Sequence, residues 1–369
     1  MMDIQKVVLH IVQMPLKNAF STHLGTVDIR DGIIIEVIDG NGMSGYGEVV
    51  AFTTPWYTEE TVKTCLHMLE EILIPLVFSK EIKHPKEIIT LFNSVRRNQM
   101  AKASLEMAIW DLFAKQQNKP LWKIIGGSRQ EVLSGAVVSA SSMELMIRQT
   151  EDLVQEGYTR IKVKISPKHD YGILQSLRKK FPHLMIMADA NSAYSLQDKE
   201  ELKKLDELKL EMVEQPLAVD DIVEHAILQK ELQTPICLDE SITSPMDMKN
   251  AIHLQSCKMV NIKLARVGGY SNALDIYKLC QQNNIGVWCG GMIEFGVSRA
   301  HNIALATLSG FSFPGDIVSS TRYWEEDIIE PEITVKNGKI KRINSPGIGV
   351  TINWKRMMEV TKSRKEYNA

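Results

Sequence analysis

The sequence predicts an α/β fold: a (β/α)7β barrel of the TIM type, with an α+β capping domain formed by the N-terminal third and a C-terminal segment. Two observations carry this prediction. Short apolar segments alternate with helix-length intervals from residue 133 to residue 316, which is typical of a parallel sheet closed into a barrel. The segments before and after this region lack the alternation. We expect domain boundaries at 1–126, 127–320 and 321–369.

The N-terminal third predicts strands followed by helices. Residues 5–14 (QKVVLHIVQM) and 32–50 (GIIIEVIDGNGMSGYGEVV) predict an antiparallel meander. It turns at residues 39–42, where Gly and Asn supply the turn chemistry. From about residue 58 to residue 117 the apolar residues recur at helix spacing, most clearly in MAKASLEMAIWDLFAK. This part of the chain is therefore expected to be an α+β unit.

Eight short apolar segments in the middle of the chain are the expected barrel strands. They are 133–139, 160–165, 184–190, 210–216, 235–241, 259–265, 286–292 and 311–316. Helix-length intervals separate them, so each strand is expected to run parallel to the next. After residue 320 the pattern lapses into short strand-like pieces, and the polar tail KSRKEYNA is expected to be frayed.

The composition is that of a soluble enzyme. The 369 residues are 44% hydrophobic and 24% charged with a net charge of −2, and no basic stripe or charge block predicts a nucleic-acid or membrane partner. The N-terminal residues lack the uninterrupted apolar segment of a signal peptide. Five cysteines, an odd number, fit a reducing cytoplasm better than a disulfide framework. Because helical barrel exteriors commonly support self-association, we also expect a homo-oligomer.

Charged residues stand near the ends of five successive predicted strands. Lys164, Asp189, Glu214 and Asp239 follow one another at intervals of 25 residues, and Lys263 comes 24 residues later. A constant interval of one strand–helix unit places these side chains at the C-terminal rim, where barrel enzymes carry their active sites. A single carboxylate after a strand is usually a helix cap. Three on adjacent strands, flanked by lysines, favour a functional site instead.

The three carboxylates predict a divalent metal. Clustered carboxylates repel one another unless a cation neutralises them, and a set made only of carboxylates suits a hard ion. No histidine belongs to the set, which argues against zinc. The prediction is Mg²⁺, with Mn²⁺ as an alternative, held by Asp189, Glu214 and Asp239.

The lysines predict proton transfer at a carbon next to a carboxylate. Lys164 is expected to lie beside Lys162 and near the metal in a water-poor barrel mouth, which favours its neutral, basic form. Lys263 stands on the opposite wall of the barrel, so the substrate carboxylate would have a lysine on each face. The metal and Lys162 would stabilise the resulting enediolate.

Several motifs together resemble those of the enolase superfamily, in its muconate-lactonising subgroup. They are KVK (162–164), DAN (189–191), EQP (214–216), DES (239–241), NIKLARVGG (261–269), GYGE (45–48), GGMIEFGVSRAHN (290–302) and FPGDI (313–317). Within the superfamily, PLKNAFSTHLGT (15–26) and VAFTTPWYTEET (50–61) are most similar to the branch of o-succinylbenzoate synthases and N-succinylamino-acid racemases. The resemblance covers nearly the whole chain.

The resemblance implies a role for each candidate residue. Lys164 matches the lysine that removes the α-proton and then protonates the departing hydroxide, and Lys263 matches the opposite lysine, which is the second acid or base in racemisation. Asp189, Glu214 and Asp239 match the metal ligands. Phe20, Phe52 and Tyr57 match the family's capping loops, and Asn191 matches a supporting polar group. The other residues expected to bind substrate are Lys162, Gly291 and Met292. Glu240 and Arg266 match residues that support the metal ligands and tune Lys263.

The branch implies a reaction, and other reactions stay open. A hydroxycyclohexadiene carboxylate with a succinyl chain would lose water to give o-succinylbenzoate, on the route to menaquinone. The same lysine pair also suits a racemase of N-acylamino acids. A Schiff-base aldolase could use a barrel lysine as well, but it leaves the three carboxylates unexplained. A non-catalytic barrel that kept the fold is the remaining alternative.

Overall fold

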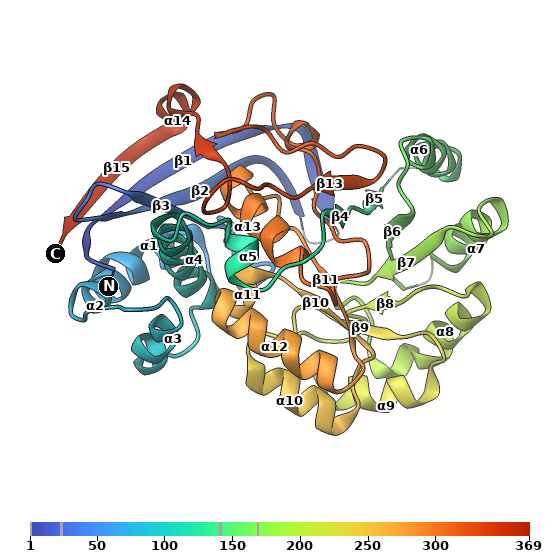
Figure 1. Ribbon diagram of the computed structural model, residues 1–369. Coiled ribbons are helices and arrows are strands. Elements are labelled where there is room, and N and C mark those ends of the chain that lie inside the picture. The colour runs from blue at the N-terminus through green and yellow to red at the C-terminus, as the bar shows by residue number, and fades with distance from the viewer. Residues whose placement is uncertain (1, 23–24, 140–141, 168–169) are drawn as a thin grey trace.

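The computed structural model describes residues 2–22, 25–139, 142–167 and 170–369 (Figure 1). An antiparallel sheet with its helices forms a cap, and a parallel sheet surrounded by helices lies beside it as the barrel. This is the α/β architecture that the sequence predicts. The exact domain boundaries stay predictions.

The capping sheet has the strand order β15-β1-β2-β3. Its strands are β1 (Ile4–Thr22), β2 (Gly25–Asp39), β3 (Ser44–Val49) and β15 (Thr361–Asn368), and the helices near it are α1 (Val62–Met68), α2 (Ile74–Phe78), α3 (Glu87–Leu91), α4 (Gln99–Gln116), α5 (Leu121–Ile124) and α14 (Trp354–Val360). The predicted meander is confirmed. Its turn closes where the N–H of Gly42 donates to the carbonyl oxygen of Asp39 at 2.9 Å.

Helix α4 packs closely against β3 and is buried along most of its length. Two glycines of β3 allow this approach, because a Cβ atom on Gly47 would lie 2.0 Å from the carbonyl oxygen of Ser104. Close packing against α4 therefore explains both glycines of the GYGE motif.

Two buried glutamates of the capping part accept hydrogen bonds from the first backbone N–H groups of barrel helices. Glu106 on α4 accepts from Tyr270 (2.5 Å) and Ser271 (3.0 Å), and Glu48 on β3 accepts from Phe295 (2.8 Å) and Ser298 (2.7 Å). Burial raises the pKa of Glu106 to about 7 and that of Glu48 to about 8, although these N–H groups oppose the shift. Both contacts fix the orientation of the cap on the barrel.

The barrel sheet has seven parallel strands in sequence order, β5 to β11. They are β5 (Ala136–Val138), β6 (Arg160–Lys164), β7 (Met185–Asp189), β8 (Val213–Glu214), β9 (Ile236–Leu238), β10 (Met259–Ile262) and β11 (Gly286–Cys289). The helices are α6 (Met143–Gln155), α7 (Asp170–Lys180), α8 (Lys199–Lys204), α9 (Val223–Glu231), α10 (Pro245–Leu254), α11 (Leu264–Val267), α12 (Tyr270–Gln282) and α13 (Gly296–Ala306). Two small pairs complete the fold: β4 (Glu131–Leu133) with β13 (Lys339–Lys341), and β12 (Ile329–Glu330) with β14 (Thr351–Ile352).

The eighth predicted strand differs from the expectation. Residues 311–316 form only a bridge between Ser134 and Gly315, not a ladder. The segment still joins both edges of the sheet, because the N–H of Gly135 donates to Gly315 at 2.7 Å and the N–H of Asp316 donates to Cys289 at 2.9 Å. Pro314 lacks a backbone N–H, which limits a regular ladder here.

The prediction of a frayed tail is wrong. The tail forms strand β15, which pairs antiparallel with β1 from Lys6↔Asn368 onward. Lys365 and Tyr367 also bind Glu70, at 2.5 Å and 2.6 Å. An edge strand can be held by its backbone hydrogen bonds. It therefore does not need alternating apolar residues, which are the signal by which a strand is predicted from sequence.

Among the helices of the described ranges, none is both long and apolar enough to cross a bilayer. All five cysteines are buried free thiols.

Candidate active site

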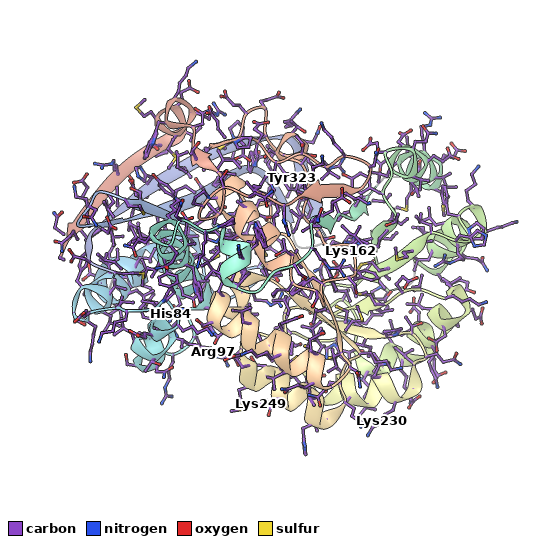
Figure 2. The ribbon with its side chains drawn as sticks, in the orientation of Figure 1. His84, Arg97, Lys162, Lys230, Lys249 and Tyr323 are labelled. Carbon is purple, nitrogen blue, oxygen red and sulfur yellow. The ribbon has the colours of Figure 1, made fainter. Side chains whose placement is uncertain are left out.

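A pocket lies where the C-terminal ends of the barrel strands meet the capping part. Figure 2 labels two of its lining residues: Tyr323 lies beside the capping sheet, and Lys162 lies among the barrel strands. Most of the predicted site residues line it, namely Phe20, Phe52, Tyr57, Lys162, Lys164, Asp189, Asn191, Lys263, Gly291 and Met292. Its volume is about 80 Å³, far below the ~300–1,000 Å³ of typical ligand pockets. The space at the centre of the site is therefore small in this structure.

Strand β6 carries both of its lysines on the inner face of the barrel, as predicted. Ile161 and Val163 alternate with them and are buried on the outer side, in the core beneath the helices. In register with Asp189 on β7, Lys164 Nζ lies 2.7 Å from Asp189 Oδ2. Lys162 Nζ lies deeper, 3.0 Å from the same oxygen and 3.1 Å from Glu214 Oε2.

A second cluster on the opposite side of the pocket surrounds Lys263, at the end of β10. Its Nζ lies 2.8 Å from Asp239 Oδ2 and donates to the hydroxyl of Tyr57 at 2.9 Å. Arg266 follows on α11, one turn later, and its Nη1 pairs with Asp239 Oδ1. Tyr57 donates to that same oxygen at 3.0 Å, so a residue of the capping part reaches the centre of the barrel site.

Two supporting residues lie on the edge of these clusters. Asn191 accepts a short hydrogen bond from Lys164 through Oδ1 and donates to Glu240 Oε1 at 3.1 Å. Burial raises the pKa of Glu240, although Lys263 opposes the shift. The structure thus brings all predicted site residues together, and their chemical roles stay predictions.

The buried lysines are held in their charged form in this arrangement. Burial alone would lower the pKa of Lys162, but Asp316, Glu214 and Asp189 outweigh it and hold the pKa well above its ordinary value. The pKa of Lys263 is raised in the same way, against burial, by its charged and hydroxyl neighbours. Burial would raise the pKa of Asp189, but the adjacent lysines hold it far below normal.

The donor set fits a hard divalent cation by its chemistry. Asp189 and Glu214 are neighbours in register on β7 and β8, and Asp239 follows β9. All three carboxylates are buried. In the described part of the chain, no three His, Cys, Asp or Glu side chains are gathered to hold a metal as they stand. In this structure a lysine ammonium group lies within 3.1 Å of each of these carboxylates.

Sequence analysis missed three residues that shape this site. Asp316 binds Lys162 Nζ at 2.5 Å and Arg160 Nη2 at 2.8 Å, from the segment that replaces the eighth strand. Asn261 donates to Glu214 Oε1 at 2.7 Å, and Gln215 accepts from the backbone N–H of Asp239 at 3.0 Å. The carboxylate in FPGDI stands at a predicted strand end, so the signal for Asp316 was present in the sequence.

A chamber of about 640 Å³ adjoins the pocket. The two spaces share Phe20, Val137, Lys164, Val318 and Tyr323. Its other walls are mixed: Leu153 and Tyr158 are among them, and so are the charged Glu156 and Arg322. Part of a substrate that extends past Lys164 would enter this chamber.

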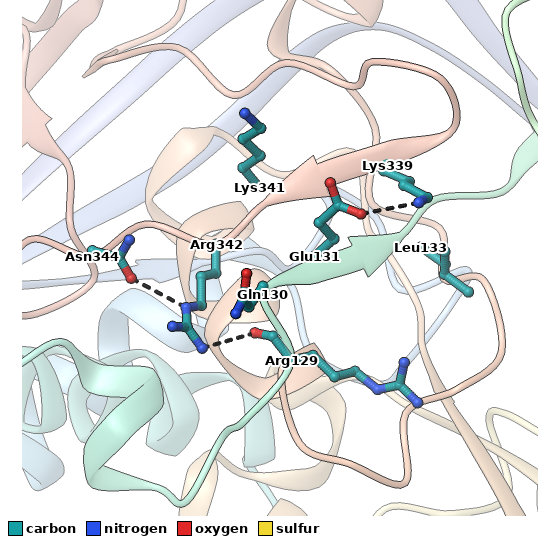
Figure 3. Close-up of a pocket in the computed structure, with 8 residues that line it drawn as sticks. All are labelled: Arg129, Gln130, Glu131, Leu133, Lys339, Lys341, Arg342 and Asn344. Carbon is teal, nitrogen blue, oxygen red and sulfur yellow. Dashed lines mark hydrogen bonds and ion pairs between the residues drawn. The ribbon is translucent and has the colours of Figure 1, made fainter.

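Another hollow, of about 750 Å³, lies away from the site, beside the β4–β13 pair (Figure 3). It has basic side chains, but Lys339 pairs with Glu131 at 3.0 Å and Arg342 donates to the backbone of Ser128 at 3.2 Å. None of the predicted site residues lines it.

Comparisons with known proteins agree with this geometry. The family model for the mandelate racemase / muconate lactonizing enzyme N-terminal domain matches residues 4–126, and the enolase C-terminal domain-like model matches residues 145–356. The chain is 48% identical to the o-succinylbenzoate synthase of Geobacillus kaustophilus. The match of 367 residues covers 99% of this chain and 98% of that protein.

Two further relatives support the same assignment. The N-succinylamino acid racemase of Thermus thermophilus is 45% identical over 350 residues, covering 95% of each chain. A solved structure of an enolase-superfamily member from Listeria innocua is 44% identical, covers 100% of both chains and has a TM-score of 0.98. The chain therefore belongs to the enolase superfamily and contains both domains of its mandelate racemase and muconate lactonizing enzyme group.

Proposed function

We propose that the protein is an o-succinylbenzoate synthase, which dehydrates a succinyl-bearing hydroxycyclohexadiene carboxylate with the help of Mg²⁺. The observation that carries the proposal is a pocket with Lys164 and Lys263 on strands four places apart in the sheet, above three buried carboxylates. The 48% identity to a synthase over nearly the whole chain supports the choice of reaction.

Lys164 performs both proton transfers in the proposed reaction. Its neutral Nζ removes the proton from the carbon next to the carboxylate, and the electron pair of that C–H bond moves into the carboxylate to form an enediolate. When the enediolate collapses, the C–O bond breaks and Lys164 returns its proton to the departing hydroxide, giving water. The reaction moves one proton from the substrate to Lys164 and back on the same face of the substrate, and it needs no oxidant or reductant.

The other residues stabilise charge in this proposal. Asp189, Glu214 and Asp239 would hold the Mg²⁺ ion, which supplies positive charge to the substrate carboxylate when bound. Membership of the superfamily itself implies such an ion, because its sites combine a Lys or His base with Mg²⁺. Lys162 and Lys263 add positive charge where the enediolate develops. The adjoining chamber would take the succinyl chain.

Racemisation of N-succinylamino acids is the second candidate, because a lysine stands on each wall. Steady-state assays with Mg²⁺ separate the two: we expect kcat/KM for the cyclohexadiene carboxylate to exceed that for N-succinylamino acids by at least about tenfold. Efficient racemisation with negligible dehydration would replace the synthase assignment by the racemase. Cytoplasmic location and a homo-oligomeric state stay predictions.

The two-face arrangement predicts a selective effect of Lys263→Ala. Each lysine reaches one face of the α-carbon, so exchange of the α-hydrogen for solvent deuterium should survive for one enantiomer of an N-succinylamino acid and fall by ~10²-fold or more for the other. NMR in D₂O measures this exchange. The control is Lys258→Ala, an exposed residue just before the same strand, which should leave both rates unchanged. Equal loss of exchange for both enantiomers in a folded Lys263→Ala protein would contradict the arrangement.

A further inference from the structure

Two walls of the pocket come from different parts of the molecule. Phe52 belongs to the capping part and follows β3, whereas Met292 and Ile293 belong to the barrel rim after β11. The three side chains are 5–6% exposed and line the same pocket. The shape of the pocket therefore depends on how precisely these two segments are held together.

A single buried arginine of β2 binds both segments. Arg30 is 2% exposed, and its Nε donates to the carbonyl oxygen of Ile293 at 3.3 Å. Its Nη1 donates to Ala51 at 2.7 Å, and its Nη2 forms a short hydrogen bond to Val50. The guanidinium carbon also lies 4.4 Å from the centre of the Phe52 ring. In the described ranges, the hydrogen bonds found for this side chain all go to backbone carbonyl oxygens.

The barrel segment needs such support because its backbone is strained. Ile293 has a φ of +56°, a left-handed conformation that is unfavourable for a β-branched residue. Hydrogen bonds fix its neighbours: Arg299 Nη2 donates to Glu294 at 2.7 Å, and the N–H of Phe295 donates to Glu48 at 2.8 Å. Arg30 binds the strained residue itself.

Arg30 remains charged at neutral pH. Burial lowers its pKa to about 10, while Glu48 and Glu294 nearby oppose the shift. The planar, charged guanidinium group can donate hydrogen bonds to carbonyl groups on two segments at once. The ammonium group of a lysine, on its flexible side chain, cannot reproduce this geometry.

We propose that Arg30 is a positioning residue of the active site, which fixes the Phe52 segment and the Ile293 segment relative to each other and thereby sets the shape of the pocket wall that these two segments form. Only the expected change in KM rests on the proposed function; the positioning of the two segments does not. Arg30 does not line the pocket, so it acts through the two segments.

The test compares Arg30→Lys with a matched control, Arg178→Lys. Arg178 also donates to backbone carbonyls, at Leu208 (2.8 Å), Leu184 (2.7 Å) and Lys209 (3.0 Å), but it lies on α7 outside the barrel. In Arg30→Lys we expect hydrogen–deuterium exchange to rise in both 50–57 and 290–295, whereas Arg178→Lys should change neither segment. KM for the cyclohexadiene carboxylate should rise about tenfold in Arg30→Lys with kcat within about threefold, because the lysine catalysts stay in place.

Two results would overturn the proposal. One is a lower melting temperature for both variants with unchanged KM and unchanged exchange in 50–57 and 290–295, which would make Arg30 merely structural. The other is increased exchange in only one of the two segments. If Arg30→Lys fails to fold, Arg30→Gln is measured by the same criteria at lower temperature. A wild-type protein without dehydratase or racemase activity would refute the proposed function, and the exchange measurement would still decide the role of Arg30.

Discussion

Replacing Lys164 with alanine should lower kcat for dehydration by ~10⁴-fold, because the same amine removes the proton and returns it to the leaving group. The neighbouring ammonium cannot substitute, since Lys162 is bound by Asp316 at 2.5 Å and by Asp189 and Glu214 at 3.0–3.1 Å. KM should change much less, because the substrate is held mainly by other groups. Steady-state assays of purified variants measure both constants.

Two controls make this result specific. Lys180→Ala removes an exposed lysine of α7 that pairs with Glu151 at 3.1 Å, and it should leave kcat unchanged. Lys164 is partly exposed at the pocket, so its removal should not unfold the protein, which circular dichroism verifies. A folded Lys164→Ala protein with kcat within tenfold of wild type would show that another group is the base.

Removal of divalent metal should lower activity by ~10³-fold or more, because an ion that stabilises the developing charge contributes several kcal/mol. Dialysis against a chelator followed by assay measures the loss, and added Mg²⁺ should restore the rate. Without the ion, three buried carboxylates keep their lysine and arginine partners, so Lys164 stays bound to Asp189 at 2.7 Å. Full activity in excess chelator would exclude the metal-dependent mechanism.

A variant tests which residues hold the ion. Glu214→Gln keeps the shape of the side chain but removes its charge, so the Kd for Mg²⁺ should rise at least about tenfold in titration calorimetry. The control is Glu231→Gln at the end of α9, where the carboxylate pairs with the surface lysines Lys199 and Lys203. Equal affinity of wild type and Glu214→Gln would remove Glu214 from the ligand set.

The barrel and its rim were predictable because they follow from local repetition. One strand–helix unit of constant length brings Lys164 and Asp189 into register, and the pattern of alternation puts Lys162 on the same face as Lys164. Both properties follow directly from the spacing of residues in the sequence. The positions of Lys162, Lys164 and Asp189 could therefore be derived without knowledge of distant contacts.

Other features depend on contacts that no local pattern records. Strand β15 is entirely polar along its exposed edge, and its pairing with β1 joins opposite ends of the chain. Tyr57 binds Lys263 across 206 positions, so its reach into the barrel could be predicted only by resemblance. Arg30 gave no signal at all, since a lone arginine in a strand usually faces solvent.

The hydroxyl of Tyr57 joins the capping part to two candidate groups of the barrel site. It donates to Asp239 Oδ1 at 3.0 Å and accepts from Lys263 Nζ at 2.9 Å. One phenolic oxygen is thus a partner of both a candidate ligand carboxylate and a candidate acid–base lysine. Any movement of the segment that carries Tyr57 would therefore change the surroundings of both groups at once.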